Sequence, residues 1–176
     1  MSADLSFRRA TLADVERLLT YVHSAYRGEV SRKGWTTEAD LLDGQRTDVR
    51  ELKELVSGDG AQMWLLERGP ELLGTIVLKR EPEGVVHLGM IAVAPEQQGK
   101  GAGRVLLEQA EQVVREQAWG TRLEMTVIGQ RAELIAWYER RGFRVTGEQR
   151  PFPYGDTRFG LPKVRDLYFI VLAKDL

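Results

Sequence analysis

The spacing of apolar residues alternates between helical and extended periods along the chain, and each stretch predicts one element. The first stretches predict a short strand at 5–9 and a helix that Thr11 caps and that runs to about Tyr26. The apolar residues of this helix recur every three or four positions: Leu12, Val15, Leu18, Leu19 and Val22. Residues 28–48 mix charges of both signs with glycines and predict surface loop and short helix, and a further helix follows at 48–57.

Extended patterns take over in the middle of the chain. The stretches 61–68 and 71–80 flank a Gly-Pro turn and predict an antiparallel hairpin. The next stretch, 85–94, is apolar on both alternating faces, which is typical of a central strand covered on two sides.

The second half of the chain predicts a helix at 101–117, a strand at 122–128, a helix at 130–141, and strands at 143–149 and 165–174. A loop rich in proline, glycine and aromatic residues separates the last two strands. This order predicts a single domain over 1–176 of the α+β class. Its centre would be a mixed, mostly antiparallel sheet of about seven strands flanked by helices.

Composition narrows the function. The 176 residues are 43% apolar, which is enough for one sizeable core. The 25 basic and 26 acidic residues leave a net charge of −1. The overall electrostatic field of the protein therefore does not favour binding to nucleic acid or to an acidic membrane surface. The absence of cysteine excludes a cysteine nucleophile, and with only two histidines we expect no metal site. No run approaches the roughly 18 apolar residues of a membrane span, so we expect a soluble, cytoplasmic protein.

The sequence QQGKGAGR at 97–104 places three glycines at alternate positions where a strand passes into a helix. Free N–H groups and the positive dipole end at a helix start favour an anion, and glycine lets a pyrophosphate approach closely. Lys100 and Arg104 would add positive charge. The alternative is a glycine-rich turn that only permits a tight connection, and the run alone leaves both open.

Two nucleotide-binding motifs compete for this run. A P-loop is excluded because Gly99 and Lys100 are followed by Gly101 instead of Ser or Thr. A dinucleotide fingerprint fits poorly, because the pattern is GxGxG and Glu124 is the only acid placed to bind a ribose. The predicted element order also lacks the repeated βαβ units of such a fold.

Two segments resemble the GNAT superfamily of acyl-CoA-dependent N-acetyltransferases. QQGKGAGRVLL is similar to the acyl-CoA signature Q/R-x-x-G-x-G/A through Gln98, Gly101 and Gly103, and AWYERRGF at 136–143 resembles the family's helix-to-strand segment. The order of elements matches the family over nearly the whole chain. The resemblance implies an N-acetyltransferase that uses acetyl-CoA as cosubstrate and acetylates a primary amine of a small molecule or peptide. Direct transfer is expected because the chain has no cysteine. The resemblance to the family also suggests a homodimer.

The resemblance also implies where coenzyme A binds. The glycine run would hold the pyrophosphate through backbone N–H groups, and the main chain at the end of the preceding strand would bond the pantetheine arm. The implied residues are Ile91, Ala92, Val93, Gln98, Gly99, Lys100, Gly101, Ala102, Gly103 and Arg104. One position departs from the family, since Arg131 stands where many members have an asparagine.

Two residues are candidates for the chemistry. Tyr138 takes the place of the family's tyrosine that protonates the leaving sulfur; the alternative is a core aromatic, since Leu134 shares its helical face. His87 interrupts an otherwise apolar strand and is the candidate base, because an imidazole with a pKa near 6.5 accepts a proton at neutral pH. The alternative is a buried, hydrogen-bonded histidine without a catalytic role, and Glu124 is a weaker candidate base.

Aromatic residues in the two irregular stretches are candidates for the acceptor pocket: Tyr26, Trp35 and Tyr154, together with Phe152 and Phe159. The alternative is that they pin long loops to the body of the protein. Two further function classes stay open. One is a non-catalytic acyl-CoA binding or sensing domain of the same fold, and the other is a dinucleotide-binding oxidoreductase.

Overall fold

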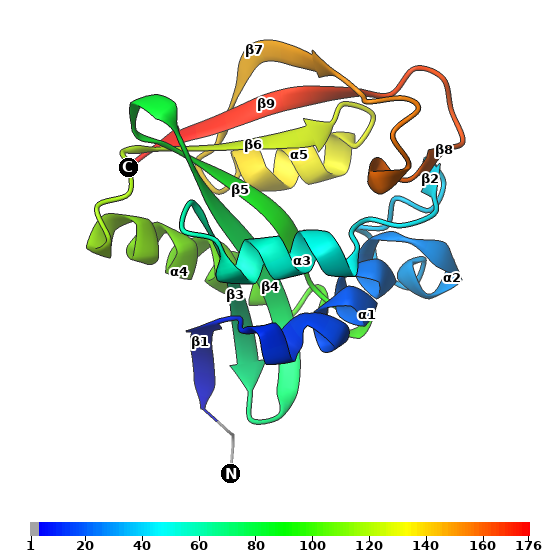
Figure 1. Ribbon diagram of the computed structural model, residues 1–176. Helices are drawn as coiled ribbons and strands as arrows, with labels where there is room; N and C mark the ends of the chain where they lie inside the picture. The colour runs from blue at the N-terminus through cyan, green and yellow to red at the C-terminus, as the bar shows by residue number, and fades with distance from the viewer. Residues whose placement is uncertain (1–3) are drawn as a thin grey trace.

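A seven-stranded sheet forms the centre of the molecule in the computed structural model, which describes residues 4–176 (Figure 1). The strands lie in the order β1 (Leu5–Arg9), β3 (Ala61–Arg68), β4 (Glu71–Glu81), β5 (Val85–Ala92), β6 (Arg122–Ile128), β9 (Tyr168–Asp175) and β7 (Arg144–Pro151). Neighbouring strands run antiparallel, apart from the parallel pair β5 and β6. The predicted α+β fold and its mostly antiparallel sheet are confirmed.

Helices cover both faces of this sheet, with α1 and α3 on one face and α4 and α5 on the other (Figure 1). The helices are α1 (Val15–Tyr26), α2 (Gly28–Ser31), α3 (Val49–Ser57), α4 (Ala102–Glu116) and α5 (Ala132–Glu139). Short 3-10 turns lie at Leu12–Asp14, Pro82–Gly84, Pro95–Gln97 and Thr157–Phe159. The helix predicted from Thr11 therefore begins with a 3-10 turn and becomes α-helical at Val15.

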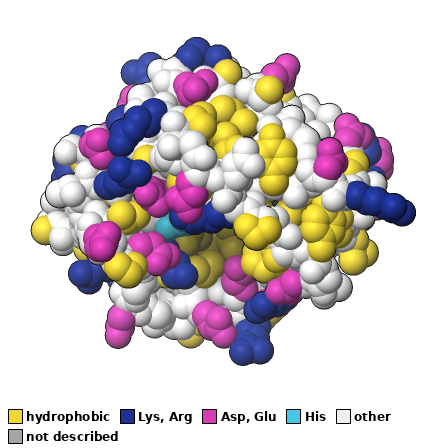
Figure 2. Space-filling view, turned by 90° about the horizontal axis from the view of Figure 1, so that it is seen from above, with side chains coloured by type: hydrophobic (Ala, Val, Ile, Leu, Met, Phe, Trp, Pro, Cys, Tyr) yellow, Lys and Arg dark blue, Asp and Glu magenta, His cyan; other side chains and the backbone are white. Residues whose placement is uncertain are grey.

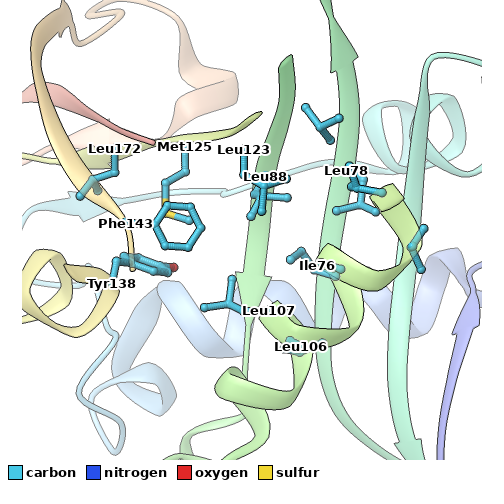
Figure 3. Close-up of a cluster of buried hydrophobic side chains, with 14 of the residues drawn as sticks. Ile76, Leu78, Leu88, Leu106, Leu107, Leu123, Met125, Tyr138, Phe143 and Leu172 are labelled. Carbon is cyan, nitrogen blue, oxygen red and sulfur yellow. The ribbon is translucent and has the colours of Figure 1, made fainter. Parts of the chain in front are cut away.

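Strand β4 is buried on both faces and separates two halves of the core. Ile76 and Leu78 pack with Leu106 of α4 on one side (Figure 3). Val77 packs with Leu18 of α1 on the other side. The helices are thereby held at fixed positions on the sheet, which also fixes the loops that lead into them.

The sheet splits between its two parallel strands. β5 and β6 pair only over 85–87 and 122–124, while β6 continues beside β9 as far as Ile128. A bulge lies in β5, where Met90 has a left-handed backbone (φ 43°) and the register against β4 shifts beyond Thr75. The second half of β5 therefore has backbone groups on its β6 side that the sheet does not pair.

A small second sheet joins the two irregular stretches of the chain. β2 (Leu42–Asp43) pairs with β8 (Leu161–Pro162), which connects 28–48 with 151–164. The sequence pattern did not predict this pairing. Beside it a small cluster buries Leu42, Ile128, Phe152 and Leu167. The two stretches thus pack on each other and on the end of β6.

No helix within residues 4–176 combines the length and the hydropathy needed to cross a bilayer. The same residues hold no group of three or more His, Cys, Asp or Glu side chains arranged to bind a metal ion.

Candidate active site

A cleft of about 790 Å³ lies between the end of β5, the glycine loop at 97–104 and α5. It brings together most of the predicted cofactor residues: Ile91, Val93, Gln98, Gly99, Gly101, Ala102, Gly103 and Arg104. Two predicted residues do not line it, because Ala92 is buried in the core and Lys100 is exposed to solvent. The cleft lies at the split in the sheet, where β6 does not pair with the backbone of β5.

The glycine loop has the backbone geometry of an anion-binding turn. Gly99 and Gly101 adopt left-handed conformations (φ 78° and 89°), and a Cβ on either would point into open space. The first backbone bond of α4 is made by Val105, so the N–H groups of 99–104 donate no hydrogen bond within residues 4–176. Such a row of free donors at a helix start favours a phosphate group.

Gln98 has a positioning role in this loop. Its Nε2 donates to the carbonyl oxygen of Val93 at 2.9 Å and to the hydroxyl of Thr36 at 2.7 Å. The side chain therefore connects the end of β5 to the early irregular stretch, and its polar atoms are already engaged. We expect Gln98 to shape the cleft, while the backbone of the loop provides the donors.

Three guanidinium groups lie on the cleft: Arg104, Arg140 and Arg141. Arg141 lies over the ring of Trp137, 3.6 Å from its centroid, and its Nη1 donates to the Trp137 carbonyl at 2.8 Å. Burial, with Arg140 and Arg104 nearby, lowers the pKa of Arg141. Our interpretation of the sequence missed Arg140 and Arg141, although the paired arginines of AWYERRGF were the available signal.

A second cavity of about 710 Å³ lies along the split, lined by 87–91 of β5 and 125–128 of β6. Figure 2 views this end of the molecule and shows a hollow with a hydrophobic floor and charged side chains of both signs around it. Four residues line both cavities: Tyr26, Ile91, Leu134 and Tyr138. The two cavities therefore meet at one junction, which a molecule in each could reach.

Tyr138 lies at this junction. Its ring packs edge-on against Trp137 at a centroid distance of 5.1 Å. It also packs edge-on against Phe143 at 5.9 Å (Figure 3). The hydroxyl forms no hydrogen bond within residues 4–176, although the residue is only 5% exposed. Burial, with a smaller contribution from Tyr26, raises the pKa of Tyr138, so the phenol keeps its proton at neutral pH. The ring belongs to the core and the hydroxyl is available as a donor.

Tyr26, at the end of α1, closes the junction opposite. Its hydroxyl donates to the backbone carbonyl of Ile91, one of the groups that the split in the sheet leaves free. Burial raises the pKa of Tyr26, so this hydroxyl also remains protonated. The predicted acceptor residue Tyr26 is thus brought to the junction.

His87 lines the second cavity but lies away from the junction. It stands four residues before Ile91 on the same strand, a separation of about 13 Å at roughly 3.3 Å per residue. Burial lowers the pKa of His87, while Glu81 opposes the effect, so the ring is neutral at pH 7. Glu124 is paired with Arg122 at 3.0 Å and lines neither cavity.

A buried ion cluster borders the second cavity. Arg27 donates to Glu38 through Nη1, and Arg131 lies on the other carboxylate oxygen at 3.4 Å. The side chains of Arg27 and Arg131 are only 2% and 9% exposed. Burial alone would raise the pKa of Glu38, but Arg27, Arg131 and Arg46 outweigh it, so the pKa is lowered and Glu38 stays ionised.

This cluster holds the irregular stretches in place. Arg131 also donates to the carbonyl of Thr36, and Arg27 donates to that of Phe159 at 3.3 Å. Arg131 therefore connects the start of α5 to the loop around Thr36. An asparagine side chain at this position would be too short to reach so far.

The two remaining acceptor candidates lie elsewhere. Trp35 lines the first cavity, where its ring is 6.3 Å from that of Trp137. Tyr154 lines neither cavity. Its hydroxyl donates to the carbonyl of Val164 and accepts from the N–H of Leu167, so Tyr154 holds the late loop together. Phe152 and Phe159 line the second cavity.

Comparison with known proteins gives a consistent result. The family model described as "Acetyltransferase (GNAT) family" matches residues 30–143. A curated protein of Bacillus subtilis (strain 168), named S-alkylcysteine N-acetyltransferase, is 29% identical over 158 residues, covering 85% of this chain and 83% of that protein.

Solved structures match over almost the full chain. An N-acetyltransferase from Staphylococcus aureus Mu50 superposes with a TM-score of 0.73 at 14% identity, covering 98% of both chains. An IAA acetyltransferase from Bacillus cereus ATCC 14579 gives a TM-score of 0.67 at 19% identity, covering 98% of this chain and all of that one. At such identities these two matches bear on the fold alone.

Proposed function

The chain belongs to the acetyltransferase (GNAT) family, and on that basis we propose that it is an acetyl-CoA-dependent N-acetyltransferase that acetylates a primary amine directly. The observation that carries the proposal is the junction of two cavities at Tyr138. A cofactor in the first cavity and an amine in the second would meet there without an enzyme-bound intermediate. The name of the Bacillus subtilis relative adds S-alkylcysteines to the acceptors worth testing.

The residues of the first cavity fit coenzyme A. The free N–H groups of 99–104 would hold the pyrophosphate, with Arg104, Arg140 and Arg141 supplying positive charge. The backbone groups of 91–93 that Tyr26 and Gln98 do not engage would bond the pantetheine arm along the split in the sheet. When bound, acetyl-CoA supplies an acyl group activated as a thioester.

Tyr138 is proposed as the acid. The amine nitrogen forms the new C–N bond, the C–S bond breaks, and the departing sulfur needs a proton. The phenol is protonated at neutral pH and its hydroxyl has no competing partner within residues 4–176, so it can pass its proton to the sulfur and take one back from the acylated nitrogen. The amine must first lose a proton of its own, which is the task of the base.

His87 is proposed as that base, acting through water molecules because of its distance from the junction. Burial places the pKa of His87 under its ordinary 6.5. Below this pKa we expect the uptake of one additional proton, by His87, to lower kcat/KM of the wild type. Protonation below that pKa removes the acceptor of the proton. In His87→Gln this additional fall in kcat/KM at low pH should be absent. At pH values above the pKa of His87, kcat/KM of the variant should be lower than that of the wild type by on the order of 10²-fold.

The measurement is kcat/KM against pH at saturating acetyl-CoA. His23→Gln is the matched control, since this second histidine lies on α1 and lines neither cavity. A His87→Gln profile that coincides with the wild type would exclude His87 as the base.

Ligand binding tests the cofactor assignment. Acetyl-CoA at 100 times its Kd should stabilise the folded state by about 2.7 kcal/mol. For a chain of this size that raises Tm by roughly 5 to 10 °C. NADH serves as the control ligand and should leave Tm unchanged. No shift with acetyl-CoA, or a shift with NADH alone, would contradict the proposal, whereas a shift without turnover on any amine would favour the non-catalytic binding domain.

A further inference from the structure

We propose that the acceptor is a short amino acid whose carboxylate binds Arg46 and whose side chain is apolar. This inference rests on the proposed function, because it places the amine at Tyr138. It assigns Arg46 as the residue that selects acceptors with a carboxylate close to the amine.

The charges around the second cavity are unbalanced. Three guanidinium groups, those of Arg27, Arg46 and Arg131, lie close enough to Glu38 to lower the pKa of this single carboxylate. The cluster therefore has an excess of two positive charges in a partly buried position. Buried charges are costly without a counter-charge, so an anion entering the cavity would be stabilised here.

Arg46 is the member of this cluster that remains available. Arg27 and Arg131 are engaged by Glu38 and by backbone carbonyls. Arg46 is half-buried on the cavity wall and forms no hydrogen bond or ion pair within residues 4–176. Its guanidinium instead lies over the Tyr26 ring, 5.6 Å from the centroid.

The other two carboxylates on this wall already have partners. Glu51 accepts from the hydroxyl of Thr47 at 2.5 Å, and Glu54 is paired with Arg50 at 3.2 Å. Both belong to α3 and neither contacts Arg46 by a hydrogen bond. The guanidinium of Arg46 is thus free for a ligand, and a carboxylate matches its forked donors.

The position of Arg46 limits the length of the acceptor. One tyrosine ring separates Arg46 from the junction. The Tyr26 hydroxyl donates to Ile91 at the junction, and the Arg46 guanidinium lies over the face of the Tyr26 ring. An amine at the junction and a carboxylate on Arg46 are therefore only a few bonds apart, as in an α-amino acid. Apart from Lys79, Arg80, His87 and Thr126, the rest of the wall is apolar and includes Leu42, Val77, Met125, Val127, Phe152 and Phe169.

The test uses matched acceptors. L-Leucine, L-methionine, L-phenylalanine and S-benzyl-L-cysteine are each compared with the corresponding amide and decarboxylated amine. At least one free acid should exceed its amide and its amine by about 10- to 100-fold in kcat/KM, the range of a hydrogen bond to a charged group. Arg46→Gln should abolish this preference and Arg46→Lys should restore part of it, while KM for acetyl-CoA stays unchanged.

A binding measurement separates this inference from the proposed function. Titration of the same acids and amides into the CoA-saturated protein should show the preference in Kd, even if no acceptor turns over. Arg50→Gln is the matched control, because Arg50 is 89% exposed and paired with Glu54 on the helix surface. Equal kcat/KM and equal Kd for every acid and its amide, or a preference that survives in Arg46→Gln, would overturn the assignment.

Discussion

Replacing Tyr138 by phenylalanine is expected to lower kcat by about 10²- to 10⁴-fold, the usual contribution of a general acid. The phenyl ring keeps the edge-on packing on Trp137 and Phe143, so the folded state and the Kd for acetyl-CoA should change little. Only the hydroxyl is lost, and with it the proton for the departing sulfur. The readout is therefore a fall in kcat without a matching rise in the cofactor Kd.

The control for this variant is Tyr168→Phe, which removes a hydroxyl from β9 at a position that lines neither cavity. It should retain the wild-type rate. A Tyr138→Phe enzyme that keeps full kcat over the whole pH range would show that the sulfur takes its proton from another source.

Glu38→Gln is expected to cost about 3–5 kcal/mol of unfolding free energy, the usual penalty for leaving buried charges without their partner. Arg27 and Arg131 would both remain buried without the carboxylate that binds them. For a chain of this size the loss lowers Tm by roughly 6 to 20 °C. Thermal unfolding at pH 7 measures it.

The pH dependence of this difference follows from the lowered pKa of Glu38. The stabilisation by the charged pair is complete above the pKa of an unfolded glutamate, about 4.3, and is lost as pH falls through the lower folded value. The gap in Tm between wild type and Glu38→Gln should therefore narrow in acid. Glu29→Gln is the control, since Glu29 is 88% exposed and solvent screens its pair with Arg32. Equal Tm for Glu38→Gln and wild type at pH 7 would refute the structural role of the cluster.

Local patterns were sufficient for most of the fold. Helical spacing predicted α1, α3 and α4, and the doubly apolar stretch that contains β5 was recognised as a central strand. The pairing of strands with one another was not predictable, because the apolar periodicity shows which face of a strand is buried and not which strand lies beside it. The two-residue pairing of β2 with β8 and the split between β5 and β6 depend on contacts between distant segments.

The candidate site also contains some residues that local sequence patterns predict and others that only the fold brings together. The glycine loop and Tyr138 belong to short motifs whose residues are close in sequence, so they could be predicted. Arg27, Glu38 and Arg131 resemble surface charges in the sequence, and they meet only because the fold joins positions as many as 93 residues apart. Tyr154, predicted to contact the acceptor, lines neither cavity, and its hydroxyl closes the late loop.

The fate of the acetyl group tests the central claim most directly. Acetyl-CoA and the protein are incubated with amino acids including S-alkylcysteines, polyamines, aminoglycosides and free peptide N-termini, and thiol release and product mass are followed together. We predict one N-acetylated amine for each coenzyme A released, with the mass of the protein itself unchanged. An acetylated protein that passes its acetyl group to the amine, or acetyl-CoA binding with no N-acetylated product from any acceptor, would contradict direct transfer at the junction of the two cavities.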